Sequence, residues 1–196
     1  MRLGLRVIVA ALLLGVVTGV ASAHITPPVV LASDRDALVS LLSGARKFFV
    51  REVRLSAEQK QAIQRQSGWA PDEDFYRFYL GRDAEGRLVA ATTFLTEYTV
   101  HGPIRVAVSL DPSGKVKGVM VMEVTEETYG WVKPLIDAKL VGAYVGQDAS
   151  GKFVMGGDAD RRLQPMEQFY GQIIGSLVKR AALLYEVGIG REGRAA

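Results

Sequence analysis

The longest regular pattern of apolar positions lies close to the C-terminus and predicts a helix. Apolar side chains recur there at intervals of three and four residues, which places them on one helical face. These positions are Met166, Phe169, Tyr170, Ile173, Ile174, Leu177, Val178, Ala181, Leu184 and Tyr185. Gly171 and Gly175 lie near that face, where small residues allow close approach of a sheet. Gly188 and Gly190 predict the end of the helix.

Between residues 75 and 124 the apolar positions change to aromatic and β-branched runs, which predict strands. Four such runs, 75–80, 88–99, 104–110 and 116–124, are separated by turn segments at 83–86, 101–103 and 111–114. This order predicts an antiparallel meander. In 104–110 the alternation predicts one buried and one exposed face. The apolar run 119–122 predicts a central strand whose two methionines fill the core.

Shorter elements precede the meander. Ser33 with Asp36, and Ser56 with Gln59, have the spacing of capping boxes and predict two short helices, the second polar and facing solvent. Residues 47–55 alternate as a strand does. Together the elements predict an α+β fold: an antiparallel sheet of about five strands, short N-terminal helices and a long C-terminal helix packed on one face.

The first 23 residues have the organisation of an export signal. Two arginines precede an uncharged apolar core of 14 residues, 7–20, and Ala21-Ser22-Ala23 is an A-x-A cleavage site. A core shorter than the ~20 residues that span a bilayer favours cleavage before His24 over retention as an anchor. We therefore divide the chain into a signal peptide (1–23), a lead with a short helix (24–43) and a main domain (44–196). The predicted location is periplasmic or otherwise extracytoplasmic, with attachment to the inner membrane if the leader is retained.

Composition and charge narrow the chemistry. The chain has no cysteine, which excludes disulfide scaffolds, thiolate zinc and iron–sulfur sites, covalent c-type haem and cysteine nucleophiles. Its 24 basic and 21 acidic residues give +3, and removal of Arg2 and Arg6 with the leader leaves 22 − 21 = +1. Because nucleic-acid binding requires a clustered basic face, a net charge this small predicts no nucleic-acid partner.

The segment Glu123–Trp131 has an unusual density of chemical groups. It holds three carboxylates, two threonine hydroxyls and two aromatic rings, and we expect it at the end of the central strand with a turn at Gly130. Strand ends of this kind are places where ligands meet backbone donors and aromatic rings. The same composition also fits a solvated strand end without a ligand.

At this segment the sequence resembles the FMN-binding domain family, found in the G subunit of the Rnf electron-transport complex and the C subunit of the sodium-pumping NADH:quinone reductase. The likeness covers residues 43–186. It includes the segments Gly44–Phe48, Val53–Gln59, His101–Ile104 and Asp111–Val121. The most specific match is Glu127–Gly130, which is similar to the family's E-T-x-G segment beside the flavin. The resemblance implies an extracytoplasmic domain that holds FMN. It also implies electron transfer with membrane-bound or periplasmic redox proteins rather than stand-alone enzymatic activity.

The chain departs from the family at the start of the C-terminal helix. Members with covalent flavin carry an S/T-G-A-T/S motif there, and it falls on residues 165–168, where Gln168 replaces the acceptor hydroxyl. An amide cannot form the phosphoester, and Glu167 adds negative charge where a phosphate would lie. We therefore expect noncovalent FMN, held by Glu127, Thr128, Tyr129, Gly130 and Trp131 and by backbone donors near Gln168. In this hypothesis the Thr128 hydroxyl and the amides near Gly130 bond the polar rim of the flavin.

Two further functions fit the sequence. The first is a cofactor-free periplasmic interaction or regulatory module of a redox complex. The second is a copper protein, because the α-amine and imidazole of an N-terminal His24 can chelate Cu(II), with His101 as the only other imidazole to complete the site.

Overall fold

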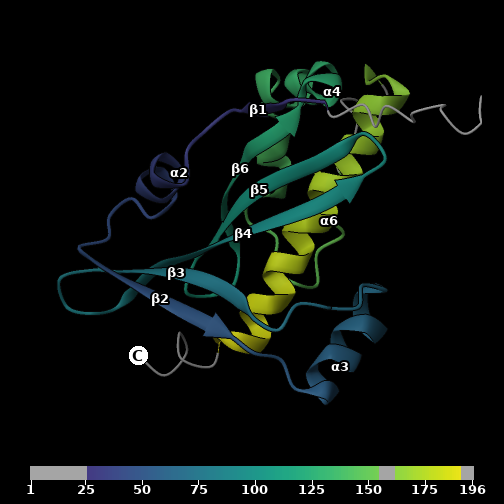
Figure 1. Ribbon diagram of the computed structural model, residues 1–196. Coiled ribbons are helices and arrows are strands. Elements are labelled where there is room, and N and C mark those ends of the chain that lie inside the picture. The colour runs from purple at the N-terminus through teal and green to yellow at the C-terminus, as the bar shows by residue number, and fades with distance from the viewer. Residues whose placement is uncertain (1–25, 155–161, 191–196) are drawn as a thin grey trace, which may run out of the picture.

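The protein has an α+β fold built on one antiparallel sheet. The computed structural model describes residues 26–154 and 162–190. The elements are β1 (Pro28–Val30), α2 (Asp34–Leu41), β2 (Lys47–Val53), α3 (Ala57–Ser67), β3 (Tyr76–Arg82), β4 (Leu88–Thr99), β5 (Gly102–Leu110), β6 (Val116–Thr125), α4 (Glu126–Asp137), the 3₁₀ helix η1 (Leu140–Tyr144) and α6 (Pro165–Gly188). The strand order is β1-β6-β5-β4-β3-β2, and α6 runs along one face (Figure 1). The predicted fold class and the long C-terminal helix are thus confirmed.

The sheet has six strands, where the sequence predicts about five. The additional strand is β1, which lies in the segment expected to be only an extended lead, and its Pro28 pairs with Thr125 of β6. Proline has no backbone N–H to donate and is tolerated at a sheet edge. β6 is therefore an inner strand next to the edge rather than the centre of the sheet.

The main core lies between α6 and the sheet. The residues that alternate along β5 toward α6, Ile104, Val106, Val108 and Leu110, are fully buried. The opposite face of β5 is buried as well, because α2 packs Ala37 and Leu41 against Ala107 and Met122. The expectation of one exposed face on this strand is therefore wrong. Met122 fills this second core, as predicted for the methionines.

A third contact fixes the middle of α6 against the segment that follows α4. The Tyr144 hydroxyl donates to the Gly171 carbonyl at 2.8 Å. A Cβ placed on Gly175 would lie 2.2 Å from the carbonyl oxygen of Phe153. Gly175 therefore admits the 144–153 segment, and not the sheet as the sequence suggested.

The short helices begin where their capping residues predict. Ser33 caps α2 by accepting from the backbone N–H of Asp36, and Ser56 and Gln59 form the capping box of α3. α3 ends at Gly68, which has a left-handed φ of 76°. α3 buries only Ile63, which confirms that it is a solvent-facing helix.

An ion pair between α2 and β5 gives a prediction for the pH dependence of stability. Both carboxylate oxygens of Asp34 accept from the Arg105 guanidinium, at 2.5 and 2.9 Å. These hydrogen bonds hold the pKa of Asp34 below its ordinary value of 3.8. A depressed carboxylate pKa contributes stability above the unfolded-state pKa, and the contribution is lost as pH falls through the folded-state pKa.

We expect Asp34→Asn to lower the free energy of unfolding by about 0.5–1 kcal/mol near neutral pH, because the pair is partly solvent-exposed. In urea unfolding, the difference from the wild type should shrink as pH falls below 3.8. A difference that is the same at neutral and at acidic pH would show that the ion pair is not its source.

Candidate functional site

The segment predicted to form a strand end and glycine turn is the first part of a helix. β6 ends at Thr125, and α4 begins at Glu126. Thr125 caps the helix by accepting from the backbone N–H of Thr128, and the Thr128 hydroxyl accepts from the backbone N–H of Thr125 at 3.0 Å. This reciprocal box begins a helix directly at the end of the strand. Gly130 is thus a helical residue, which corrects the predicted turn.

The hydroxyl of Thr128 forms its hydrogen bonds with Thr125 inside the protein. The side chain is completely buried. Its oxygen accepts from Thr125 N and lies within hydrogen-bond distance of both Thr125 Oγ1 and the Thr125 carbonyl, at 3.1 and 3.2 Å. A hydroxyl has one proton and two lone pairs, so the proton and one lone pair are engaged with Thr125. The role of Thr128 toward a flavin stays a prediction.

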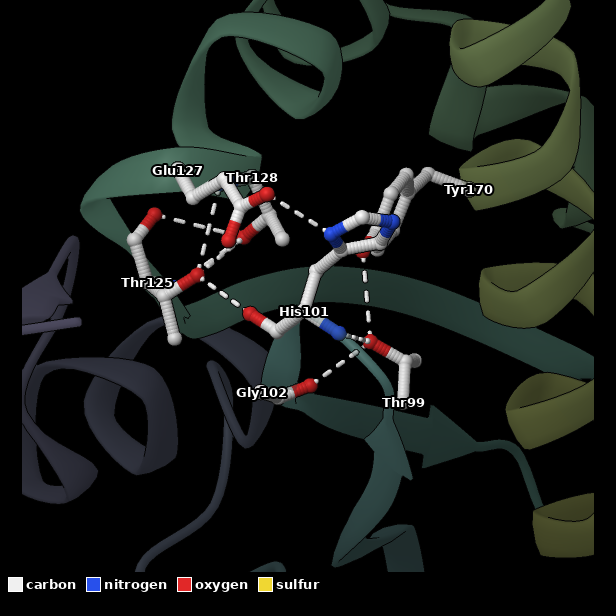
Figure 2. A network of polar contacts seen from close by, with 7 residues as sticks. All are labelled: Thr99, His101, Gly102, Thr125, Glu127, Thr128 and Tyr170. Carbon is white, nitrogen blue, oxygen red and sulfur yellow. Dashed lines mark hydrogen bonds and ion pairs between the residues drawn. The ribbon is translucent and has the colours of Figure 1, made fainter. Parts of the chain in front are cut away.

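A polar network ties α4 to the hairpin between β4 and β5 (Figure 2). His101 Nδ1 lies 2.7 Å from Glu127 Oε1, and the His101 carbonyl accepts from Thr125 Oγ1 at 2.8 Å. Thr99 Oγ1 donates to the Gly102 carbonyl at 2.9 Å and accepts from the backbone N–H of His101 at 3.1 Å. The expected turn at 101–103 is therefore shorter, since Gly102 pairs with Thr99 as the first residue of β5.

The network continues into α6 through Tyr170. The Tyr170 hydroxyl lies 3.3 Å from Thr99 Oγ1. Figure 2 shows these two side chains facing each other. Because the Thr99 proton goes to Gly102, Tyr170 is the donor in this pair. Burial raises the pKa of Tyr170, and the hydrogen bond with Thr99 opposes that shift. The hydroxyl therefore stays protonated at neutral pH and holds the hairpin against α6.

Aromatic rings form a row across the same junction. Trp131 stacks on Tyr170 with ring centroids 5.7 Å apart and an interplanar angle of 20°. His101 meets Trp131 edge-on at 5.1 Å, and Phe169 meets Tyr170 edge-on at 5.4 Å. Such pairs stabilise beyond the area that they bury. The row brings the E-T-x-G segment together with the start of α6, although the two are distant in sequence.

Gly130 leaves the surface of α4 bare beside this row. The residue is exposed, and a Cβ placed on it would meet nothing within 4 Å. Its φ is not positive, so neither backbone conformation nor packing requires glycine here. Tyr129, by contrast, packs against the main core.

The first turn of α6 satisfies its own polar groups. Pro165 stands at the first helical position, and Glu167 Oε2 accepts from the backbone N–H of Gln164 at 2.9 Å. The Gln168 amide donates to the Leu163 carbonyl at 3.0 Å. Glu167 therefore completes the cap of this helix, and Gln168 ties the helix to the residue that precedes its cap.

The copper hypothesis depends on a residue outside the described part of the chain. His24 precedes residue 26, where the description begins. His101, the other imidazole, lies against the Glu127 carboxylate. Among residues 26–154 and 162–190, no group of three or more His, Cys, Asp or Glu side chains could hold a metal ion.

The fold also contains a cavity that was not foreseen from the sequence. It measures about 460 Å³, and its lining includes Trp69, Tyr76, Tyr98 and Arg180. Arg180 lies over the Trp69 ring at 5.2 Å and pairs with Glu97 at 2.5 Å. An aromatic cage attracts a cation, and here the protein's own arginine takes that place. No local motif signals this cavity, because its walls come from three separate segments, 69–77, 94–98 and 177–180.

No model of a known protein family matches the chain, and no curated protein sequence matches it. Within the residues that the structure describes, no helix combines the length and the apolar character needed to cross a membrane.

Proposed function

We propose that the protein is an extracytoplasmic FMN-binding-like domain that holds FMN noncovalently at the exposed face of α4 and serves electron transfer in or beside a membrane redox system. The observation that carries this proposal is the bare helix surface at Gly130, next to the junction of α4 and α6.

Gly130 is unfavourable for the helix unless it serves another purpose. Glycine inside a helix costs about 0.5–1 kcal/mol relative to alanine. The open space above it means that packing gives nothing back. Glycine is the residue that lets a flat ring approach a helix backbone closely. The position therefore fits the ring system of a flavin, with Trp131 as the following residue.

A phosphate has a partner on the same face of α4. Lys133 is one helical turn beyond Gly130 and is half-exposed. Its ammonium pairs with Asp137, and that hydrogen bond raises the pKa of Lys133, so it remains charged. The start of α6 fits a phosphate less well, because Glu167 is there. Lys133 is thus the residue that we assign to the phosphate.

Bound FMN would supply one-electron and two-electron redox chemistry. The roles left to this chain are to bind the flavin, orient it and exclude water from one side of it. The hydrogen bonds of Figure 2 hold His101 and Tyr170 in place through Thr125 and Thr99. Trp131 is held by its ring contacts with these two side chains. These positioning roles favour an electron-transfer or accessory protein over a stand-alone enzyme.

Gly130→Ala separates the functional from the structural interpretation. We expect FMN affinity, measured by fluorescence titration, to fall about tenfold because the methyl group holds the ring off the helix. Stability should rise by about 0.5–1 kcal/mol, as for any exposed helical glycine. Gly142→Ala in η1 is the matched control, because Gly142 also has open space around its Cβ position. It should leave FMN affinity unchanged.

Three results would count against the proposal. Unchanged FMN affinity in Gly130→Ala would place the flavin elsewhere. A wild-type protein that binds no FMN would favour the cofactor-free interaction module, which the internally satisfied Thr128 and the closed ring row also suit. An intact mass that includes covalent flavin would show that the motif was wrongly aligned on residues 165–168.

A further inference from the structure

The edge strand β2 exposes three consecutive apolar residues. Phe48, Phe49 and Val50 are 62%, 50% and 58% exposed. β2 pairs with β3 on one side only and ends the sheet, at the outer margin in Figure 1. Side chains alternate along a strand, and Val53 belongs to the main core. Phe49 therefore points to the α6 side, whereas Phe48 and Val50 point to the α2 side, so apolar groups flank the edge on both faces.

Basic residues surround this apolar edge. Residues 46–54 contain Arg46, Lys47, Arg51 and Arg54 against the single acid Glu52, a net charge of 4 − 1 = +3. The whole chain has 24 − 21 = +3, so this segment carries as much net positive charge as the entire protein. Arg46 and Lys47 are exposed and directly precede Phe48.

The acidic residues near β2 do not neutralise the Phe48 end of the strand, because they pair with other arginines or lie at its far end. In the turn after β3, Asp83 and Glu85 both pair with Arg87. The acidic residues 72–74 precede Tyr76, which pairs with Val53 at the other end of β2. Glu52 pairs with Arg54 and Arg77. The exposed rings therefore stand in a basic environment.

A second copy of the chain fits this edge poorly. Antiparallel pairing of two β2 strands about Phe49 would set Lys47 opposite Arg51 of the other copy, twice. Pairing about Val50 would set Arg46 opposite Arg54. Like charges directly opposite one another destabilise a strand pair. The occupant must instead offer negative charge and an apolar interior together.

We propose that β2 is an edge-on docking site for an anionic phospholipid bilayer. The rings of Phe48 and Phe49 and the Val50 side chain enter the boundary between headgroups and acyl chains, and Arg46 and Lys47 extend their stems so that their charges meet the lipid phosphates. The unpaired backbone groups of the edge stay at the hydrated headgroup level, because only side chains insert. α4 lies at the opposite margin of the molecule in Figure 1 and therefore remains accessible. This inference does not depend on flavin binding.

Vesicle cosedimentation tests the docking site. The chain as purified after export is mixed with vesicles of phosphatidylcholine alone, or of equal parts phosphatidylcholine and phosphatidylglycerol. The readout is the additional binding that phosphatidylglycerol causes, compared between the wild type and the variants, because a retained leader with its two arginines would contribute alike to all of them. We expect this addition to decrease about tenfold in Phe48→Ser/Phe49→Ser and in Arg46→Ser/Lys47→Ser, and to fall with added salt.

The control is Tyr98→Ser, because Tyr98 is 80% exposed but lies on β4. It should bind like the wild type, and circular dichroism should show all variants folded. Equal binding to both vesicle types by the wild type, or unchanged binding in the two β2 variants, would overturn the proposal. A wild-type dimer that the β2 variants convert to monomer would assign the edge to a second copy instead.

Discussion

Replacing Gly175 by alanine is expected to lower the free energy of unfolding by about 3 kcal/mol, the upper part of the range for overpacked cores. The added methyl carbon would lie 2.2 Å from the Phe153 carbonyl oxygen and 3.2 Å from the Tyr144 hydroxyl. Neither neighbour can yield easily. Phe153 is buried with a positive φ of 51°, and Tyr144 is held by its hydrogen bond to Gly171. The 144–153 segment and α6 must therefore move apart.

Urea unfolding measures this loss, and a thermal scan should show a melting temperature lower by about 6–12 °C. Gly142→Ala is the matched control, because it adds the same methyl group to the neighbouring η1 where nothing lies within 4 Å. It should change stability by less than about 0.5 kcal/mol. Equal effects of the two substitutions would contradict the close packing of α6 on the 144–153 segment.

Thr128→Ala is expected to destabilise the protein by about 2–3 kcal/mol. Loss of a helix cap costs about 1 kcal/mol, and a buried group left without its partner adds about 1–3 kcal/mol. In the variant, the backbone N–H of Thr125 loses its acceptor in a site that is almost fully closed to solvent. The Thr125 hydroxyl, which also holds the His101 carbonyl, loses a neighbour as well.

Chemical denaturation with two further variants separates the causes. Thr128→Ser keeps the hydroxyl and should recover most of the stability. Ser56→Ala removes the equivalent box of α3, where both partners are exposed, and should cost only about 1 kcal/mol. If Thr128→Ala lowers the free energy of unfolding no more than Ser56→Ala does, burial adds nothing to the stability of the capping box of α4. In that case Thr128→Ala stays folded well enough to test in FMN titrations whether this segment binds the flavin.

Elements with strong local signals could be predicted from the sequence alone. The period of α6 spans most of its 24 residues, and the caps Ser33, Ser56 and Gly68 lie within one turn of the helix ends that they define. The turn at 111–114 closes through a hydrogen bond from Gly114 N to the Asp111 carbonyl at 3.0 Å. These features depend on neighbours in the chain, so the sequence contains all the information that decides them.

The change from strand to helix at Glu126 was missed although a signal exists. Thr125 and Thr128 have the spacing of a capping box, but the second residue is threonine rather than the usual Glu or Gln. The aromatic and β-branched run that precedes it favoured extended structure. As a result the predicted conformation of this segment was wrong, because residues from Glu126 onward form a helix.

The sequence by itself determined the α+β class, the element order apart from β1, α4 and η1, and the chemical composition of the segment beside Gly130. Only the tertiary structure decided which side chains that segment meets. The stacking of Trp131 on Tyr170, the approach of Phe153 to Gly175 and the burial of Ala107 beneath α2 each join residues far apart in the chain. Such contacts follow from strand register and helix placement. Both result from many weak packing interactions between distant parts of the chain, so no local pattern encodes them.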